Sequence, residues 1–201
     1  MSKKLLYLFG EPGTGKITIA HILQARLGWR LFWLHDLDPI CSIVGRYPLP
    51  RLMDRVSLAV LEELMEAGEN IVYVRPSRDR ESVARVLDLA RFAGYESYPI
   101  RLWAPRWALL ERVATREPSQ FRVGNNEQLT RYLDNRPSTS DCLASMTVNT
   151  FDQTPEQSAD EIERYLLTER KADGKRGRRT NCRAASEQAT GLSGGCAAVQ
   201  S

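Results

Sequence analysis

The chain lacks the features typical of disulfide-stapled, zinc-clustered and membrane-spanning proteins. Its four cysteines lie far apart and none forms a C-x-x-C pair, which argues against a zinc ribbon or a disulfide framework and fits a reduced setting. No apolar run approaches the ~20 residues of a membrane span, and the apolar stretch near the N-terminus is too short for a signal peptide. We therefore expect a soluble, cytoplasmic protein with no membrane partner.

The chain also has little net charge outside its last residues. The formal net charge is +3, but residues 169–201 carry seven Lys/Arg and three Asp/Glu, which leaves 21 basic and 22 acidic residues in 1–168. The basicity therefore belongs to the tail and says nothing about a basic groove on the folded body. Residues 169–201 contain no aromatic residue and few aliphatic ones, so we expect a disordered, basic, low-complexity tail. Contact of this tail with nucleic acid is a less favoured alternative.

Short apolar runs alternate with helical patterns through residues 1–168, which we expect to form one domain. The nearly continuous apolar character of the runs favours a parallel sheet covered on both faces, and the repeated alternation favours a three-layer αβα sandwich of the α/β class. Strands are expected at 5–9, 30–34, 70–74, 98–103 and 146–150. Helices are expected at 16–27, 49–67, 79–92, 105–116 and 155–167.

Two helix ends carry local signals, and one segment interrupts the alternation. Gly68 is expected at the C-cap region of the second helix. Thr154, Pro155 and Gln157 are expected to cap the last helix through a capping box with proline at its first position. Residues 117–141 are polar, contain arginines and are long for a plain connection, so a mobile lid is expected there.

The stretch "GEPGTGK" after the first strand fits the pattern G-x-x-x-x-G-K. Glycines allow successive backbone N–H groups to turn around phosphate oxygens, the following helix adds the positive end of its dipole, and the lysine reaches the β- and γ-phosphates. The strand before and the helix after place the motif in the structural context that it requires. The predicted nucleotide-binding residues are Gly10, Glu11, Pro12, Gly13, Thr14, Gly15, Lys16, Ile17 and Thr18.

Ile17 stands where such loops have the serine or threonine that supplies a hydroxyl to Mg²⁺. Isoleucine cannot coordinate a hard cation, which requires oxygen ligands. Thr18 lies about 100° further around the helix, so its hydroxyl faces a different direction. Nucleotide binding is therefore expected to survive this change better than metal-dependent turnover.

Two carboxylates, Asp36 and Asp38, follow the second strand in "LHDLDP". The carboxyl ends of parallel strands meet at one edge of a sheet, so this pair should share an edge with the glycine-rich loop. The two groups could hold Mg²⁺ through water and accept a proton from an attacking hydroxyl. The alternative is a solvated turn before Pro39, and His35 is expected to pack or cap rather than to catalyse.

Arg112 and Arg116 are four residues apart and should share one helical face. They precede the expected lid, which itself contains Arg122 and Arg131. Such arginines could close over a transferring phosphoryl group and neutralise its charge. The alternative is a solvated basic face paired with neighbouring glutamates.

Together these motifs resemble the P-loop small-molecule and nucleotide kinases, such as shikimate kinase, gluconate kinase, chloramphenicol phosphotransferase, adenylate kinase and the kinase domain of polynucleotide kinase. Besides "GEPGTGK", the similarity rests on "HDLD", "EAGENIVYV", "LWAPRWALLERVATRE" and "NTFDQTPEQSADEIERYL". The resemblance implies a five-stranded parallel sheet in the order 2-3-1-4-5, ATP and Mg²⁺ as cofactors, and transfer of the γ-phosphoryl group to a small-molecule or nucleotide acceptor. It also implies that Lys16, Asp36, Arg112 and Arg116 are catalytic, that Asp36 and Asp38 lie on the metal side, and that residues 150–154 border the adenine.

The chain departs from this family at two positions. Ile17 replaces the metal-binding residue, and Arg75 follows the third strand where many relatives have an aspartate. With Arg46, Arg51 and Arg55, Arg75 suggests an anionic acceptor, although a solvated basic helix would look the same. Two alternatives to a kinase of small molecules therefore stay open, namely a nucleotide-binding module that no longer catalyses and a nucleic-acid end kinase.

Overall fold

The computed structural model describes residues 3–37, 50–76, 80–116, 123–135 and 143–180. The chain divides into two compact units, Met1–Glu163 and Arg164–Ser201. In the described part of the chain, no helix has the length and apolar character needed to cross a bilayer.

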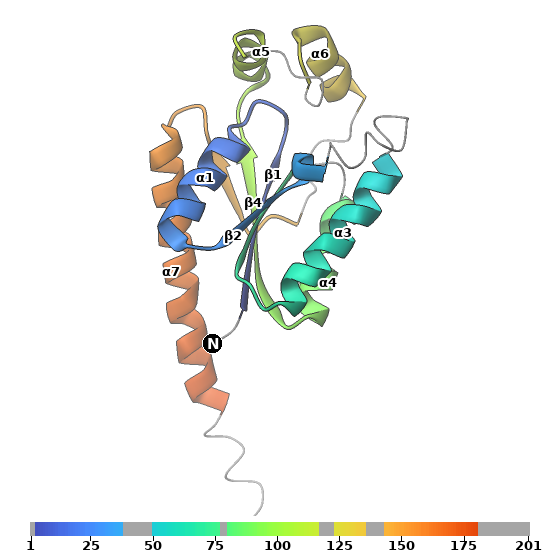
Figure 1. Ribbon diagram of the computed structural model, residues 1–201. Coiled ribbons are helices and arrows are strands. Elements are labelled where there is room, and N and C mark those ends of the chain that lie inside the picture. Colours follow the sequence, from blue (N-terminus) through green and yellow to red (C-terminus); the bar gives the residue numbers. More distant parts are fainter. Residues whose placement is uncertain (1–2, 38–49, 77–79, 117–122, 136–142, 181–201) are drawn as a thin grey trace, which may run out of the picture. The chain divides into compact units, whose positions relative to one another are not determined.

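The first unit contains a single five-stranded parallel sheet with the strand order β2-β3-β1-β4-β5 (Figure 1). This is the predicted fold class and strand order. The strands are β1 (Lys3–Gly10), β2 (Arg30–Trp33), β3 (Ile71–Pro76), β4 (Tyr95–Trp103) and β5 (Met146–Asn149).

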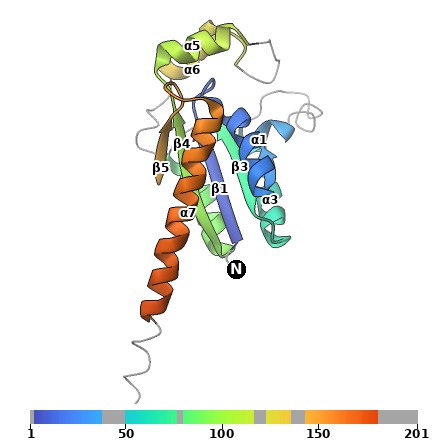
Figure 2. The ribbon, with the colours of Figure 1, turned by 90° about the vertical axis from the view of Figure 1, so that its left-hand side faces the viewer.

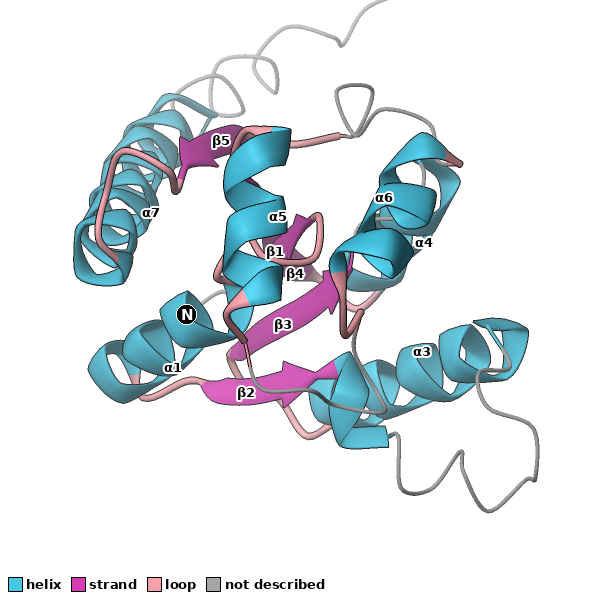
Figure 3. Ribbon diagram, turned by 90° about the horizontal axis from the view of Figure 1, so that it is seen from above, coloured by secondary structure: helices cyan, strands magenta, loops and turns pink. Residues whose placement is uncertain are grey.

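Helices cover both faces of the sheet and lie above its carboxyl edge. Seen from above, α1 and the beginning of α7 lie on one face, α3 and α4 lie on the other, and α5 and α6 lie over the ends of the strands (Figures 2 and 3). The helices are α1 (Lys16–Leu27), the short 3₁₀-helix η1 (Leu34–Leu37), α3 (Pro50–Glu66), α4 (Arg80–Phe92), α5 (Arg106–Ala114), α6 (Asn126–Asp134) and α7 (Pro155–Thr180).

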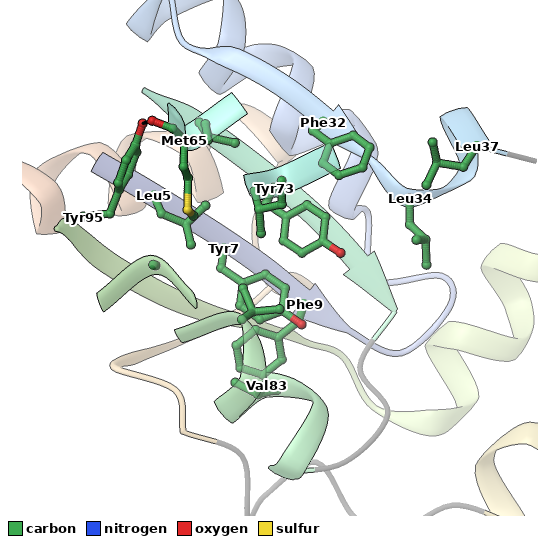
Figure 4. Packing of buried hydrophobic residues seen from close by; sticks show 14 of the residues in the cluster. Leu5, Tyr7, Phe9, Phe32, Leu34, Leu37, Met65, Tyr73, Val83 and Tyr95 are labelled. Carbon is green, nitrogen blue, oxygen red and sulfur yellow. Dashed lines mark hydrogen bonds between the residues drawn. The ribbon is translucent and has the colours of Figure 1, made fainter. Parts of the chain in front are cut away.

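The main core lies between the sheet and the helices α3 and α4. Alternate residues of β1 point to this side, because successive side chains of a strand face opposite ways. Tyr73 stacks between Tyr7 and Phe32, with a centroid separation of 5.2 Å in each pair (Figure 4). These rings hold the middle of the sheet rigid beneath its carboxyl edge.

The predicted helix ends have the expected local geometry. Gly68 has φ 75° and its N–H donates to the carbonyl of Met65 at the end of α3. At the start of α7, the Thr154 hydroxyl accepts from the Gln157 N–H, and the Gln157 side chain accepts from the Thr154 N–H. This reciprocal pair is the predicted capping box, and the positive φ explains why glycine occupies position 68.

Two features differ from the sequence-based expectations. Helix α6 forms inside the segment expected to be a lid, and its Leu129 is fully buried against Leu109 and Val113 of α5. Helix α7 extends to Thr180 instead of ending near Leu167; residues 169–180 contain four arginines and two lysines, which favour a helical backbone. The division of the chain at residue 168 and the lid function of 117–141 stay predictions, and 117–122 and 136–142 lie outside the described residues.

Candidate functional site

The loop that joins β1 to α1, residues 10–16, depends on its glycines. Gly10, Gly13 and Gly15 have φ values of 149°, 91° and 78°, which L-residues with a side chain rarely adopt. A Cβ atom at Gly10 would also clash with the carbonyl oxygen of Leu102 in β4. The loop therefore lies directly against the neighbouring strand, and α1 begins at Lys16 with a left-handed Gly15 as its N-cap.

The side chain of Lys16 folds back across this loop. Its ammonium group donates to the carbonyl oxygens of Gly10 at 2.9 Å and Glu11 at 2.7 Å, and to the hydroxyl of Thr14 at 3.3 Å. Thr14 is buried, and its own hydroxyl donates to the Glu11 carbonyl. All three of these acceptors are neutral oxygens, so among the described residues the loop holds the ammonium group through hydrogen bonds that do not neutralise its charge.

The electrostatic surroundings of Lys16 are unusual for a lysine. Burial of the ammonium group lowers the pKa of Lys16 to about 8, the Glu11 carboxylate opposes this shift, and the Arg116 guanidinium adds to it. Desolvation disfavours the charged form of a lysine, and a nearby like charge acts in the same direction. An anion placed against the loop would favour the charged form of Lys16 again.

Arg112 connects three parts of the site. From α5, its guanidinium donates to the carbonyl of Gly13 at 3.2 Å, and to the hydroxyl and the carbonyl of Thr150 at 3.3 Å and 2.7 Å. Arg116 donates to the carbonyl of Val123, just before α6. The structure thus brings both predicted arginines to the 10–16 loop, Arg112 by direct contact and Arg116 through its effect on the pKa of Lys16.

A further arginine, Arg101, was not expected from the sequence. It lies near the end of β4, in register with Phe9 of β1, and its guanidinium is 3.8 Å from the carboxylate of Glu11. Its Nε is buried and has no hydrogen-bond partner among the described residues. The signal in the sequence was an arginine inside an otherwise apolar strand, "YPIRLW", because a charge in such a position needs a partner.

Asp36 lies in η1 at the carboxyl end of β2, and one of its carboxylate oxygens accepts from the Trp33 N–H at 3.2 Å. His35 packs against the Trp33 ring edge to face, with a centroid separation of 5.1 Å, which agrees with the packing role expected for it. Asp38, the second predicted carboxylate, lies outside the described residues. The catalytic and metal-side roles of this pair stay predictions.

Arg75 is not an exposed cation on the acceptor side. Its side chain is 2% exposed, and its guanidinium forms a hydrogen-bonded ion pair with Asp54 of α3. The charge that suggested an anionic acceptor is therefore compensated inside the protein. Arg55 on the same helix is exposed, and Arg46 and the side chain of Arg51 lie outside the described residues.

Residues 150–154, predicted to border the adenine, combine a buried and an exposed part. Thr150 is buried and held by Arg112 and by the carbonyl of Trp103. Phe151 is 41% exposed and meets the 56% exposed Trp107 of α5 edge to face, with the ring centroids 4.6 Å apart. Phe151 follows Thr150, and Arg112 joins Thr150 to Gly13 of the 10–16 loop. The exposed aromatic pair is therefore connected to the loop through Arg112.

Among the described residues, neither position 17 nor the hydroxyls beside it offer a ready ligand to Mg²⁺. Ile17 is partly buried and has no oxygen in its side chain, and Thr18 is exposed. The Thr14 hydroxyl is already bonded to Glu11 and Lys16, and the last two residues of β3 are Arg75 and Pro76. The described residues contain no cluster of three carboxylate, histidine or cysteine side chains that could hold a metal. Among the described residues, Asp36 at the carboxyl end of β2 is a carboxylate that could act on such an ion through water.

Comparison with known proteins agrees with this architecture. No family model matches the chain. Over 176 residues the chain is 24% identical to a protein of Methanosarcina mazei named "Putative adenylate kinase", and the match covers 81% of this chain and 86% of the relative.

Solved structures give the same result for the fold. The chain superposes on a sugar kinase from Janibacter sp. with a TM-score of 0.62 and 19% identity, covering 82% of this chain and 94% of the other. It has the fold of the small-molecule kinases. A gluconokinase from Sinorhizobium meliloti matches with a TM-score of 0.58 and 16% identity over 83% and 97% of the two chains. A shikimate kinase from Acinetobacter baumannii, solved with shikimate, matches with a TM-score of 0.57 and 19% identity over 83% and 94%.

Proposed function

We propose that the protein binds ATP at the 10–16 loop and transfers its γ-phosphoryl group to a small-molecule or nucleotide acceptor. The observation that carries the proposal is the convergence of Lys16, Arg112 and Arg116 on one glycine-shaped loop at the start of a helix. Such an arrangement of cations and N–H groups stabilises phosphate charge, both in a bound nucleotide and as it develops during transfer. The similarity to kinases supports the same reaction class.

In this proposal the ammonium group of Lys16 leaves its three loop acceptors and turns to the β- and γ-phosphates. Arg112 and Arg116 lie over the transferring group and neutralise its charge, while Asp36 orients the acceptor hydroxyl and takes its proton. Residues 150–154 and Trp107 border the base. The acceptor would enter beside η1, the place where Asp36 lies.

A second candidate function is a nucleotide-binding module without catalysis. Two observations favour it, namely Ile17 in the place of a hydroxyl residue and the compensation of Arg75 by Asp54. Ile17 offers no hydroxyl to a metal ion and Arg75 offers no carboxylate, whereas the cations at the loop are intact. This alternative therefore predicts ATP binding without transfer.

The test incubates the protein with γ-labelled ATP and a panel of hydroxylated acids, sugars and nucleoside monophosphates. Lys16→Ala is the inactive comparison, and Lys3→Ala is the matched control, because Lys3 is an exposed lysine at the other end of β1. Transfer that needs Lys16 but not Lys3 supports the kinase. ATP binding with no transfer to any acceptor favours the module instead, and absence of ATP binding contradicts both.

A further inference from the structure

Among the described residues, the 10–16 loop has several cations beside it and no hydroxyl at position 17 that could bind a metal ion. Within the same part of the chain, the hydrogen bonds of Lys16 and Arg112 go to neutral oxygens of the loop and of Thr150. The charge of Arg116 is close enough to lower the pKa of Lys16. Arg101 adds a buried Nε that lacks a hydrogen-bond partner among the described residues. The acidic group identified beside these cations is Glu11, which is paired with Arg101.

From this imbalance we infer that the site holds the triphosphate by its own cations and binds ATP in the metal-free form. The inference rests on the proposed ATP site and concerns the ionic form of the ligand that it takes. In a loop with a serine or threonine after the lysine, the metal ion links the phosphates to that hydroxyl, so part of the binding energy depends on the ion. Here position 17 presents an apolar side chain.

The charge of the ligand determines how removal of Mg²⁺ should change ATP binding. Metal-free ATP carries more negative charge than its Mg²⁺ complex, so a cluster of arginine and lysine side chains attracts it more strongly. The Mg²⁺ complex gains no direct ligand from the loop or from the end of β3, where Arg75 replaces a carboxylate. Removal of Mg²⁺ should therefore leave ATP binding unchanged or make it tighter.

The side chain at position 17 offers a matched pair of variants. Threonine and valine have nearly the same shape, and only threonine carries a hydroxyl. Ile17 is partly buried at the second position of α1, and both replacements keep a β-branched side chain there. Any difference between Ile17→Thr and Ile17→Val in their response to Mg²⁺ therefore reports the hydroxyl and not the packing.

The experiment measures the affinity of the native protein and of both variants for ATP by calorimetry, in Mg²⁺ and in EDTA. For the native protein and Ile17→Val we expect dissociation constants in EDTA that are equal to those in Mg²⁺ within about threefold, or lower. For Ile17→Thr we expect Mg²⁺ to tighten binding by about tenfold relative to Ile17→Val. Arg112→Ala should weaken binding more in EDTA than in Mg²⁺, whereas Arg91→Ala, an exposed arginine of α4, should change neither.

The outcomes separate this inference from the proposed function. Native binding that is about tenfold or more weaker in EDTA overturns the inference and leaves the ATP site standing. An equal response of Ile17→Thr and Ile17→Val to Mg²⁺ also overturns it, because position 17 would then not face the metal. Absence of ATP binding under both conditions overturns the proposed function itself.

Discussion

The 10–16 loop and the end of strand β3 lie side by side at the same edge of the sheet, but the basic side chains of the two places have different partners. Phe9 and Gly10 of β1 are in register with Arg75 and Pro76 of β3. At β3 the arginine is buried and paired with Asp54. At the loop, Lys16 and Arg112 are held by neutral oxygens. The charge that an incoming anion meets is therefore decided by the partners of a basic residue and not by the presence of that residue.

The largest effect is expected at the buried ion pair of Arg75 and Asp54. Asp54→Ala should lower the free energy of unfolding by about 3–5 kcal/mol, because it leaves the guanidinium of Arg75 buried without its counter-charge. Urea denaturation measures the change. The double variant Asp54→Leu with Arg75→Met removes both charges and should recover most of the loss. A loss below about 1 kcal/mol in the single variant would show that the pair is solvated.

The cations at the loop, Lys16 and Arg112, should affect ATP binding instead of folding. Lys16→Ala should weaken ATP binding by about 2–3 kcal/mol, or roughly 30- to 150-fold, the range of a hydrogen bond to a charged group. The free energy of unfolding of this variant should not fall, because the hydrogen-bond partners of the Lys16 ammonium group among the described residues are neutral. Calorimetry and urea denaturation test the two statements, with Lys3→Ala as the control. Equal binding by Lys16→Ala and native protein would contradict the assignment of the loop.

The lowered pKa of Lys16 should make ATP binding depend on pH. The free protein loses the Lys16 proton as the pH rises through about 8, whereas bound phosphates favour the charged form. Binding then requires proton uptake, so the affinity should be level below pH 8 and fall by up to about tenfold per pH unit above it. Lys16→Arg keeps its charge at these pH values and should give a level profile. A level profile in the native protein would contradict the lowered pKa.

The smallest effect is expected for an exposed arginine of the predicted lid. Arg131 pairs with Glu127 one turn earlier on α6, and both side chains are more than 70% exposed. Such pairs contribute little because water screens them. Arg131→Ala should change the free energy of unfolding by less than about 0.5 kcal/mol and ATP binding by less than about twofold. A larger loss of ATP affinity would instead place Arg131 at the phosphates.

The sequence predicted the sheet, its strand order and most helix positions, because these depend on local apolar periodicity and on glycine and capping signals. It did not predict α6, which is polar overall and contributes only a few apolar side chains, such as Leu129, to a small cluster with α5. A capping pair was nevertheless present, since the Asn125 side chain accepts from the Gln128 N–H and the Gln128 side chain accepts from the Gly124 N–H. The sequence "GNNEQ" carries this signal.

The site was predicted in part. The loop, Arg112 of α5 and Arg116 just after that helix could be singled out because their spacing reflects a strand, a turn and a helical face. The partners of Arg75 and Arg101 could not be found, because Asp54 and Glu11 are distant from them in the chain and meet them only through the register of the sheet and the packing of α3. The sequence shows that an arginine lies near the site, but it does not show whether a carboxylate compensates the charge of that arginine.

The placement of Ile17 also has a consequence for the gene. Every isoleucine codon becomes a threonine codon through one base change, so the missing hydroxyl is a single point mutation away. Ile17 is only partly buried, and threonine fits the same backbone. A random mutagenesis library would therefore contain Ile17→Thr, and the metal-free binding that we infer would be reversible by one base change.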